Sequence, residues 1–159
     1  MPRTIMTIGY EGVAIDRFFQ ELRSSGVQYL VDVRQMPLSR KPGFSKTALA
    51  AHTENHGLQY VHMVNLGCPK AIRRDYQADG DWERYTKRFL EYLDTQDAAL
   101  DDLAFLVRKG HCALLCFEAD PDTCHRKYVA EAVRDRIADA SVTHLMPTIP
   151  LRVAHAAAA

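Results

Sequence analysis

The chain has 159 residues, of which 47% are hydrophobic and 25% charged, and its 20 basic and 20 acidic residues leave a formal net charge of zero. These values are typical of one globular domain, and they exclude a protein that attracts nucleic acid or an acidic membrane through its overall field. No apolar run approaches the length of a membrane span, and the N-terminal residues lack the apolar core of a signal peptide. We therefore predict a cytoplasmic protein with one domain over residues 1–150 and a flexible tail over residues 151–159.

Strand and helix patterns alternate along the first half of the chain. Residues 4–10 are β-branched and apolar, which predicts a strand that stops at Gly9. Residues 15–26 carry apolar side chains at helical spacing, with Gly26 as the end signal. Residues 27–33 predict a second strand. The loop 34–44 contains two prolines, and Ser45 can begin a short helix that ends at Gly57.

The second half continues this alternation. Residues 58–64 predict a third strand, and residues 65–80 predict a long irregular stretch. A helical region follows and ends at Gly110, and residues 111–117 predict a fourth strand. Asp120 and Pro121 are typical of an N-cap and a first helical turn, so a helix is expected to begin there. Residues 141–146 predict a fifth strand.

This order predicts a three-layer α/β/α sandwich around a mostly parallel sheet of about five strands. In such sheets, ligands bind beyond the carboxyl ends of the strands. The groups at those ends are Gly9 with Tyr10 and Glu11, Asp32 with Arg34, the segment from His62 to Asn65, and the segment from Cys116 to Glu118. We expect the fold to gather them at one edge and to form one pocket there.

Four segments carry a resemblance to a known family: "TIGYEG" (7–12), "VDVRQMPLSRKPGFSK" (31–46), "GLQYVHMVNLGCPK" (57–70) and "LLCFEADPDTCHR" (114–126). The chain resembles the domain of unknown function 488 family, which implies a compact α/β domain and no established activity. The resemblance marks these motif positions: Gly9, Asp32, Arg34, Pro37, Ser39, Phe44, Gly67, Cys116, Glu118, Cys124, His125 and Arg126. It is weaker at Tyr10, Glu11 and Cys68, where many relatives carry other residues.

The last of these segments holds two thiols and an imidazole. Cys116 ends a strand, so it is either a small buried side chain or a nucleophilic or redox thiol. Cys124 is expected in the first turn of the helix opened by Asp120, where amide groups and the helix dipole would lower its pKa. His125 follows Cys124 directly. Because consecutive helical residues point about 100° apart, we expect them to line a pocket independently rather than to pair.

Other charged residues are candidates for ligand binding or proton transfer. Glu118 can act as a general acid/base, or it can anchor Arg126 or Arg34. Arg126 can hold an anion, or it can pair with Glu118 or Asp122. Asp32 can organise the loop that follows it and its own Arg34. Residues 33–53 contain no acid but carry Arg34, Arg40, Lys41 and Lys46 near Ser39 and Phe44, which suits a phosphate or a nucleic-acid backbone.

Three familiar sites fit less well. A Cys-x7-Cys-His spacing lacks the paired spacing of common zinc sites, so we predict no metal ligands, although a site completed by Cys68 or His62 stays open. A low-molecular-weight phosphatase needs Cys-x5-Arg, but the sixth residue after Cys116 is Asp122. The acids between the thiols also disfavour a rhodanese-type sulfurtransferase, because they repel anions. Glycine-rich phosphate loops are absent from the sequence.

These observations lead to one main hypothesis and its alternatives. We predict an enzyme that acts on an anionic ligand of phosphate, nucleotide or nucleic-acid type, without an identified cofactor. Glu118, Cys116, Cys124 and His125 are the candidate catalytic residues. The candidate ligand-binding residues are Gly9, Tyr10, Asp32, Arg34, Ser39, Arg40 and Arg126. The alternatives are a non-catalytic nucleic-acid- or protein-binding module and a metal-dependent hydrolase or metal sensor.

Overall fold

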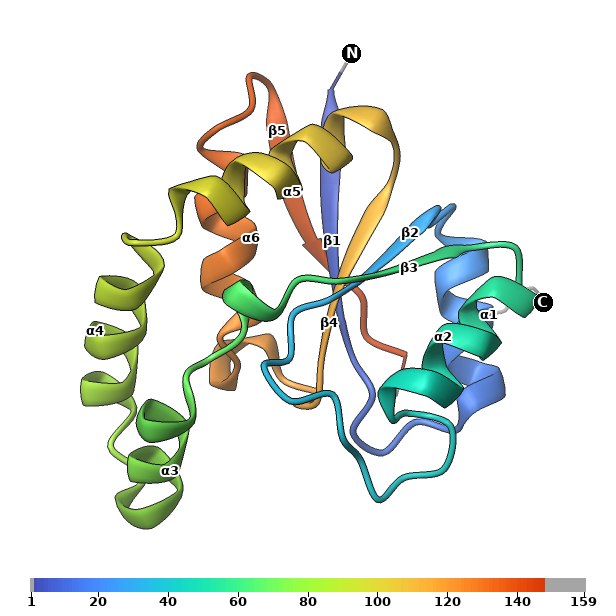
Figure 1. Ribbon diagram of the computed structural model, residues 1–159. Helices are drawn as coiled ribbons and strands as arrows, with labels where there is room; N and C mark the ends of the chain where they lie inside the picture. Colours follow the sequence, from blue (N-terminus) through green and yellow to red (C-terminus); the bar gives the residue numbers. More distant parts are fainter. Residues whose placement is uncertain (1, 148–159) are drawn as a thin grey trace, which may run out of the picture.

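The computed structural model describes residues 2–147 and contains a five-stranded sheet with helices on both faces (Figure 1). The strands lie in the order β3-β2-β4-β1-β5, and every neighbouring pair is parallel. Their bounds are β1 Arg3–Gly9, β2 Tyr29–Asp32, β3 Gln59–His62, β4 Cys112–Cys116 and β5 Ala140–His144. The predicted α/β fold is confirmed, and the sheet is wholly rather than mostly parallel.

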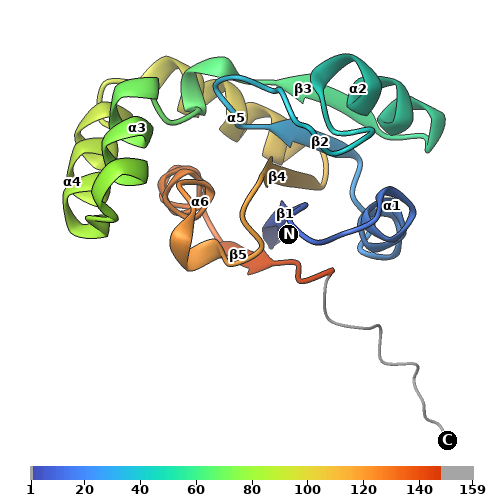
Figure 2. The same cartoon turned by 90° about the horizontal axis from the view of Figure 1, so that it is seen from below.

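Two helical layers cover the sheet, as Figure 2 shows from the carboxyl ends of the strands. One layer holds α1 (Ile15–Ser24) and α2 (Lys46–Asn55), whose apolar side chains pack with one face of the strands. The other layer holds α3 (Lys70–Asp79), α4 (Trp82–Leu93), α5 (Asp97–Lys109) and α6 (Arg126–Arg134). Two short 3₁₀ turns, η1 (Val64–Leu66) and η2 (Pro121–Thr123), precede α3 and α6.

Burial explains why these segments form these elements. All five residues of β4 are buried, as expected of a central strand covered on both faces. In α1, the buried side chains are Phe18, Phe19 and Leu22, which lie on one face at helical spacing. In β4 and α1, the buried side chains thus belong to the apolar patterns that predicted these two elements.

The prediction of an irregular stretch over residues 65–80 was wrong, because α3 occupies Lys70–Asp79. Of these ten residues, only Ile72 is buried, so the segment lacks the apolar stripe from which a helix is recognised. The helix begins after Pro69 and ends at Gly80, whose φ of 69° is left-handed. Its boundary signals are clear even though its periodicity is weak.

The expected start of the last helix was also wrong. Asp120 does cap, since its side chain accepts a hydrogen bond from the Asp122 amide, but it caps only the three-residue turn η2. Cys124 then adopts an extended conformation, with φ −136° and ψ 143°, and α6 begins at Arg126. The second thiol therefore lies between two helical segments and not in the first turn of a helix.

The strand registers bring the predicted groups to one edge. Gly9 pairs with Cys116, and Asp32 lies between Leu115 of β4 and His62 of β3. The candidate residues that follow β1, β2 and β4 are thereby adjacent at the carboxyl edge of the sheet. The predicted tail over residues 151–159 lies outside the described residues.

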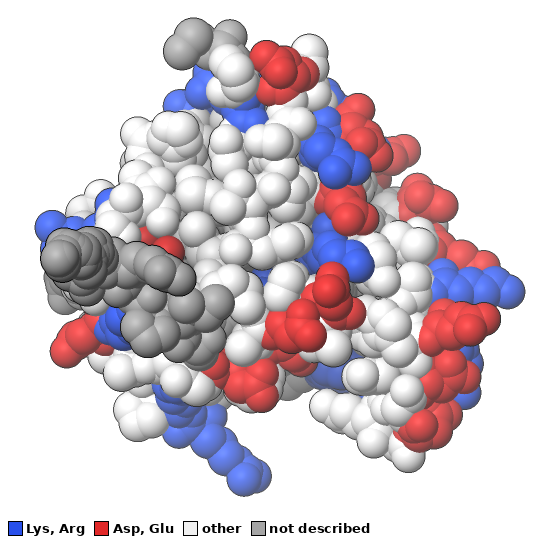
Figure 3. All heavy atoms as spheres, turned by 180° about the vertical axis from the view of Figure 1, so that it is seen from behind, with Lys and Arg blue, Asp and Glu red and all other residues white. Residues whose placement is uncertain are grey.

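The charged residues do not form a field of one sign on the face of Figure 3, where acidic and basic side chains alternate beside a broad uncharged area. Several of the exposed charges are paired, as in Arg136 with Asp97 and Asp101. Among residues 2–147, no helix has both the length and the apolar character needed to cross a membrane.

Candidate functional site

A cavity of about 690 Å³ opens at the carboxyl edge of the sheet. Its walls come from the segments after β1, β2 and β4 and from α3 and α4. Predicted residues that line it are Tyr10, Arg34, Ser39, Arg40, Cys116 with Glu118, and His125. Its volume lies within the range of about 300–1,000 Å³ that is typical of small-molecule sites.

Arg34 and Asp32 form a buried pair at the base of this cavity. The Nε and Nη2 groups of Arg34 donate to the two carboxylate oxygens of Asp32, at 2.8 and 2.7 Å. Burial disfavours the charged guanidinium, but Asp32 outweighs it and holds the pKa of Arg34 above its ordinary value. Nη1 donates to the Phe44 carbonyl oxygen at 2.7 Å and to the Tyr10 hydroxyl at 3.2 Å. Arg34 is thus largely committed to holding the 34–44 loop.

The aromatic residue of the basic segment is not available to a nucleic-acid base. Phe44 is fully buried, and its ring stacks on Tyr10 with centroids 4.5 Å apart. Ser39 is also used locally, because its hydroxyl accepts from the Lys41 amide and its own amide donates to Ser45 Oγ. These contacts make the segment an ordered wall of the cavity.

Gly9 and Arg126 shape the turn that carries Glu118. A Cβ atom on Gly9 would lie 1.8 Å from the Glu118 carbonyl oxygen, so only glycine permits the two backbones to approach. Arg126 is fully buried, and it donates to the carbonyl oxygens of Glu118 at 2.5 Å and Ala119 at 3.3 Å. Contrary to the expectations for Arg126, its bonds are to backbone oxygens and it does not line the cavity.

Cys116, Cys124 and His125 meet at the floor of the cavity. The Nδ1 atom of His125 lies 3.7 Å from Cys116 Sγ and 3.9 Å from Cys124 Sγ. The expectation that Cys124 and His125 face different directions was wrong, because Cys124 is extended rather than helical. Cys116 and His125 line the cavity, whereas Cys124 lies behind them and is 1% exposed.

Burial determines the protonation of Cys124. Desolvation is the largest effect and raises the pKa of this thiol well above its ordinary value, with a further contribution from the neighbouring Cys116. The predicted lowering by a helix N-terminus was therefore wrong, since α6 begins only after the residue. The surroundings of Cys124 therefore favour its neutral thiol form over the thiolate.

Glu118 lies beside Cys116 on the cavity wall. Its Oε1 atom is 3.7 Å from Cys116 Sγ, and the residue is half-buried. Because Arg34 pairs with Asp32 and Arg126 with backbone carbonyls, neither makes an ion pair with Glu118. Glu118 thus presents its carboxylate to the cavity next to a sulfur and an imidazole.

Two guanidinium groups on the cavity wall lack the carboxylate or carbonyl partners that Arg34 and Arg126 have. Arg40 is exposed and Arg73 is half-buried, and within residues 2–147 neither side chain makes a hydrogen bond or an ion pair. With Arg34 neutralised by Asp32, these two cations outweigh the single carboxylate of Glu118 in the lining. The open part of the cavity therefore favours an anion.

Aromatic rings from α3 and α4 form the wall next to Arg73. Trp82 stacks on Tyr85 with centroids 4.6 Å apart, and Tyr76 meets the Trp82 ring edge-on at 5.3 Å. All three residues line the cavity. Sequence reasoning missed Tyr76 and Trp82, because α3 was not predicted and nothing placed this region over the strand ends. Two aromatic residues in a stretch poor in other apolar side chains were the available signal.

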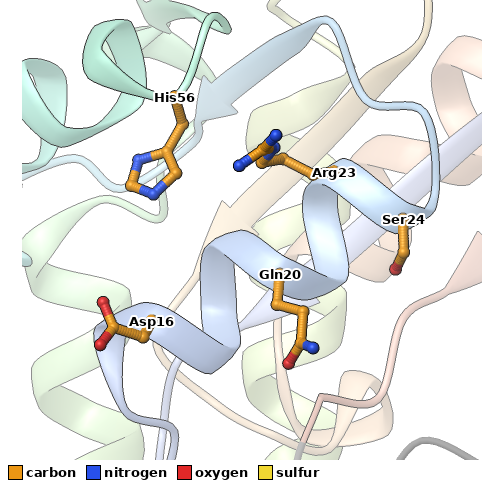
Figure 4. Close-up of a pocket in the computed structure, with 5 residues that line it drawn as sticks. All are labelled: Asp16, Gln20, Arg23, Ser24 and His56. Carbon is orange, nitrogen blue, oxygen red and sulfur yellow. The ribbon is translucent and has the colours of Figure 1, made fainter.

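A second hollow, of about 470 Å³, lies between α1 and the end of α2 (Figure 4). Its charged groups are Asp16 and Arg23 on α1, with His56 facing them. The His56 ring stacks on Phe19 at 4.4 Å, and its Nδ1 lies 2.8 Å from the His52 carbonyl oxygen. These contacts give His56 a packing role, and we place the candidate site in the larger cavity.

Comparison with known proteins gives a family but no activity. Over 100 residues, the chain is 31% identical to Elongator complex protein 3 of Dictyostelium discoideum, an alignment that covers 62% of this chain and 16% of that protein. The chain thus spans about a sixth of the length of this curated relative, and no solved structure matches it significantly. A family profile described as "Domain of unknown function DUF488" matches residues 14–133. With most of its length matched, the chain belongs to the DUF488 family.

Proposed function

We propose that this protein is an enzyme that acts on a nucleotide-type ligand, meaning a planar ring system that carries an anionic group. The supporting observation is that one cavity combines two unpaired guanidinium groups, a set of aromatic rings and a reactive end. That reactive end consists of Cys116, Glu118 and His125. An aromatic wall binds a planar ring by stacking, and arginines bind phosphate through paired N–H groups.

The arrangement gives each wall a separate task. Arg40 and Arg73 hold the anionic group, while Trp82 and Tyr76 stack against the ring. The bound ligand then extends to Glu118 and Cys116, where the reacting atom lies. Glu118 is the proton-transferring residue, since its carboxylate lines the cavity and makes no ion pair among the described residues. Asp32, Gly9 and Arg126 position these walls from outside the cavity lining, and Arg34 does so from within it through its bonds to Asp32 and Phe44.

Binding tests the first half of this proposal. A panel of inorganic phosphate, a nucleoside and the matching nucleoside mono- and diphosphates is titrated by calorimetry. We expect the nucleotides to bind more tightly than the nucleoside or phosphate alone, because only they engage both walls. Arg73→Ala is expected to weaken nucleotide binding about tenfold or more, in line with a charge-assisted contact of 1.5–3 kcal/mol. Trp82→Ala is expected to weaken the binding of the nucleotides and of the nucleoside but to leave the affinity for phosphate unchanged.

Arg74 provides the matched control. It is adjacent to Arg73 on α3 and exposed, but it does not line the cavity, so Arg74→Ala is expected to bind like the wild type. Equal effects of Arg73→Ala and Arg74→Ala would show that only diffuse charge attracts the ligand. Failure of every nucleotide in the panel to bind contradicts the proposal outright.

Turnover tests the second half. Any nucleotide that binds is incubated with the wild type and with Glu118→Gln, and the products are identified by mass spectrometry. We expect Glu118→Gln to retain binding within a few-fold and to lose product formation by a factor of about 100 or more. Binding without turnover by the wild type would favour a non-catalytic binding module instead. Oligonucleotide binding that exceeds mononucleotide binding and falls steeply with salt would favour the nucleic-acid form of that alternative.

A further inference from the structure

Three soft ligand atoms converge at the floor of the cavity from separate parts of the chain. Cys116 ends β4, and Cys124 and His125 follow the turn η2. The two sulfur atoms and the His125 Nδ1 atom all lie within 4.8 Å of one another. The spacing of these residues along the chain is not that of common zinc sites, so the sequence left a metal site open without predicting its ligands. The turn over residues 117–123 nevertheless brings the second thiol back to the first.

The two sulfur–nitrogen separations are close to those that a bound zinc ion requires. With zinc–sulfur bonds of about 2.3 Å and zinc–nitrogen bonds of about 2.0 Å at a tetrahedral angle, the sulfur and nitrogen atoms lie about 3.5 Å apart. The sulfur–nitrogen distances here are 3.7 Å for Cys116 and 3.9 Å for Cys124. Binding an ion therefore needs movements of only a few tenths of an ångström in these two pairs.

The surrounding backbone orients the ligands. The Nε2 atom of His125 lies 2.7 Å from the Val33 carbonyl oxygen, which can only accept, so Nε2 carries the proton. In the neutral imidazole, Nδ1 is then the unprotonated nitrogen, and its lone pair faces the two sulfurs. A carbonyl that holds the far nitrogen of a histidine is the usual support of a metal ligand. On the other side, the Arg126 amide donates to Cys124 Sγ at 3.5 Å, a contact that stabilises a thiolate.

A fourth direction faces the cavity. Cys116 and His125 line the cavity wall, while Cys124 lies behind them. Glu118 Oε1 is on the cavity side, 3.7 Å from Cys116 Sγ. Three protein ligands with a fourth position toward a pocket are typical of catalytic rather than structural zinc.

We propose that Cys116, Cys124 and His125 bind a thiophilic divalent cation of the zinc type, with its fourth coordination position toward Glu118 and the cavity. Two sulfurs and an imidazole favour zinc over magnesium or calcium, which prefer oxygen ligands. Two thiolates also neutralise the double charge of the ion, which suits a buried position. The catalytic meaning of this site rests on the proposed function, because the ion would face the reacting atom of the ligand. Binding of the ion does not depend on it.

Cobalt titration of the untagged, reduced and chelator-treated full chain tests the site. Cobalt replaces zinc in tetrahedral thiolate sites and makes them visible. We expect sulfur-to-cobalt charge-transfer absorption in the near ultraviolet and intense visible bands that saturate at one equivalent per chain. Zinc displaces this spectrum and raises the melting temperature, whereas magnesium changes neither. The absence of saturable cobalt and zinc binding overturns the proposal.

Matched variants identify the ligands. Cys124→Ser and His125→Gln are expected to lose the cobalt spectrum and the zinc-dependent shift in melting temperature. Cys112→Ser is the control, because Cys112 is equally buried in β4 but lies outside the cluster, and it keeps both signals. Circular dichroism identifies variants that have not folded. If both ligand variants fail to fold, the number of zinc ions bound per wild-type chain decides whether the site exists. The site is contradicted if Cys124→Ser binds cobalt or zinc as tightly as the wild type. It is also contradicted if the reduced chain binds no metal and the two thiols of Cys116 and Cys124 instead form a disulfide on oxidation.

The metal and nucleotide experiments can each contradict one proposal without affecting the other. Cobalt binding is measured without any nucleotide, and nucleotide affinity is compared between Arg73→Ala and Arg74→Ala in chelator-treated protein. Metal binding without nucleotide binding would retain the site and discard the proposed substrate. Nucleotide binding without metal binding would retain the proposed function and discard the ion.

Discussion

The carboxylate of Asp32 holds the guanidinium of Arg34 at 2.7 Å, with the two side chains only 0% and 6% exposed. Tyr60 adds a hydrogen bond from its hydroxyl to the same carboxylate oxygen, Asp32 Oδ2, at 2.5 Å. Burial and the hydrogen bond to Asp32 both raise the pKa of Tyr60, so its hydroxyl stays protonated as a donor. The pair joins the end of β2 to the 34–44 loop, and through that loop it determines one wall of the cavity.

Asp32→Asn is therefore expected to lower the free energy of unfolding by about 3–5 kcal/mol, because it leaves a buried guanidinium without its counter-ion. Urea unfolding measures this loss. Asp135→Asn is the matched control, since Asp135 pairs with Arg134 at 3.4 Å on the surface and its side chain is 72% exposed. It is expected to change stability by less than about 1 kcal/mol. Similar losses in the two variants would mean that the Asp32–Arg34 pair adds no more than a surface contact.

Gly9→Ala is expected to destabilise the protein by about 3 kcal/mol, because the added methyl group meets the Glu118 backbone and must displace it. Gly26→Ala is the comparison, since nothing lies within 4 Å of a Cβ atom there and only its φ of 74° opposes alanine. Gly26→Ala is expected to lower the free energy of unfolding by about 1 kcal/mol. Thermal unfolding compares the two, and a smaller loss for Gly9→Ala would show that the 118–119 turn yields easily.

Thiol reactivity is expected to follow access to the cavity. Cys116 and Cys68 line it, whereas Cys112 is fully buried in β4 and burial raises its pKa to about 12. With chelator present, iodoacetamide should modify the two cavity thiols in the native protein and Cys112 only after unfolding. Peptide mass spectrometry over a time course gives the order. Early modification of Cys112 would contradict the described packing of β4.

His144 is expected to make stability depend on pH. Burial is the main cause that lowers the pKa of His144 below its ordinary 6.5, and the positive charge of Arg126 adds to it. The unfolded chain therefore binds a proton more readily than the folded protein, so stability is full above pH 6.5 and falls as the pH drops through the lowered pKa. Its ring also meets the Thr7 hydroxyl, with Nδ1 and Oγ1 2.6 Å apart.

His144→Gln should reduce this loss, as measured by urea unfolding at several values between about pH 8 and about pH 5. The test compares how steeply the free energy of unfolding changes with pH in the wild type and in the variant over that interval. A uniform change in stability does not affect this comparison. Parallel curves for the two proteins would exclude His144 as a source of the dependence.

The sequence alone determined the layers and the edge at which the site lies. Apolar runs bounded by glycine predicted the strands, and helical spacing in residues such as Phe18 and Leu22 predicted α1. Such patterns are readable because the burial of one face repeats along a single element. The rule that parallel strands end at a common edge then placed Asp32 and Cys116 near each other, as the strand register confirms.

Only the tertiary structure decided which of these groups face the cavity and one another. Arg126 and Arg34 have the same chemistry as Arg73, yet the first two hold backbone or a carboxylate, and Arg73 alone of the three is unpaired. The meeting of Cys124 with Cys116 depends on an extended residue between two short helical segments, which no periodicity encodes. Contacts between distant segments depend on how whole elements pack, and a local pattern carries no information about that packing.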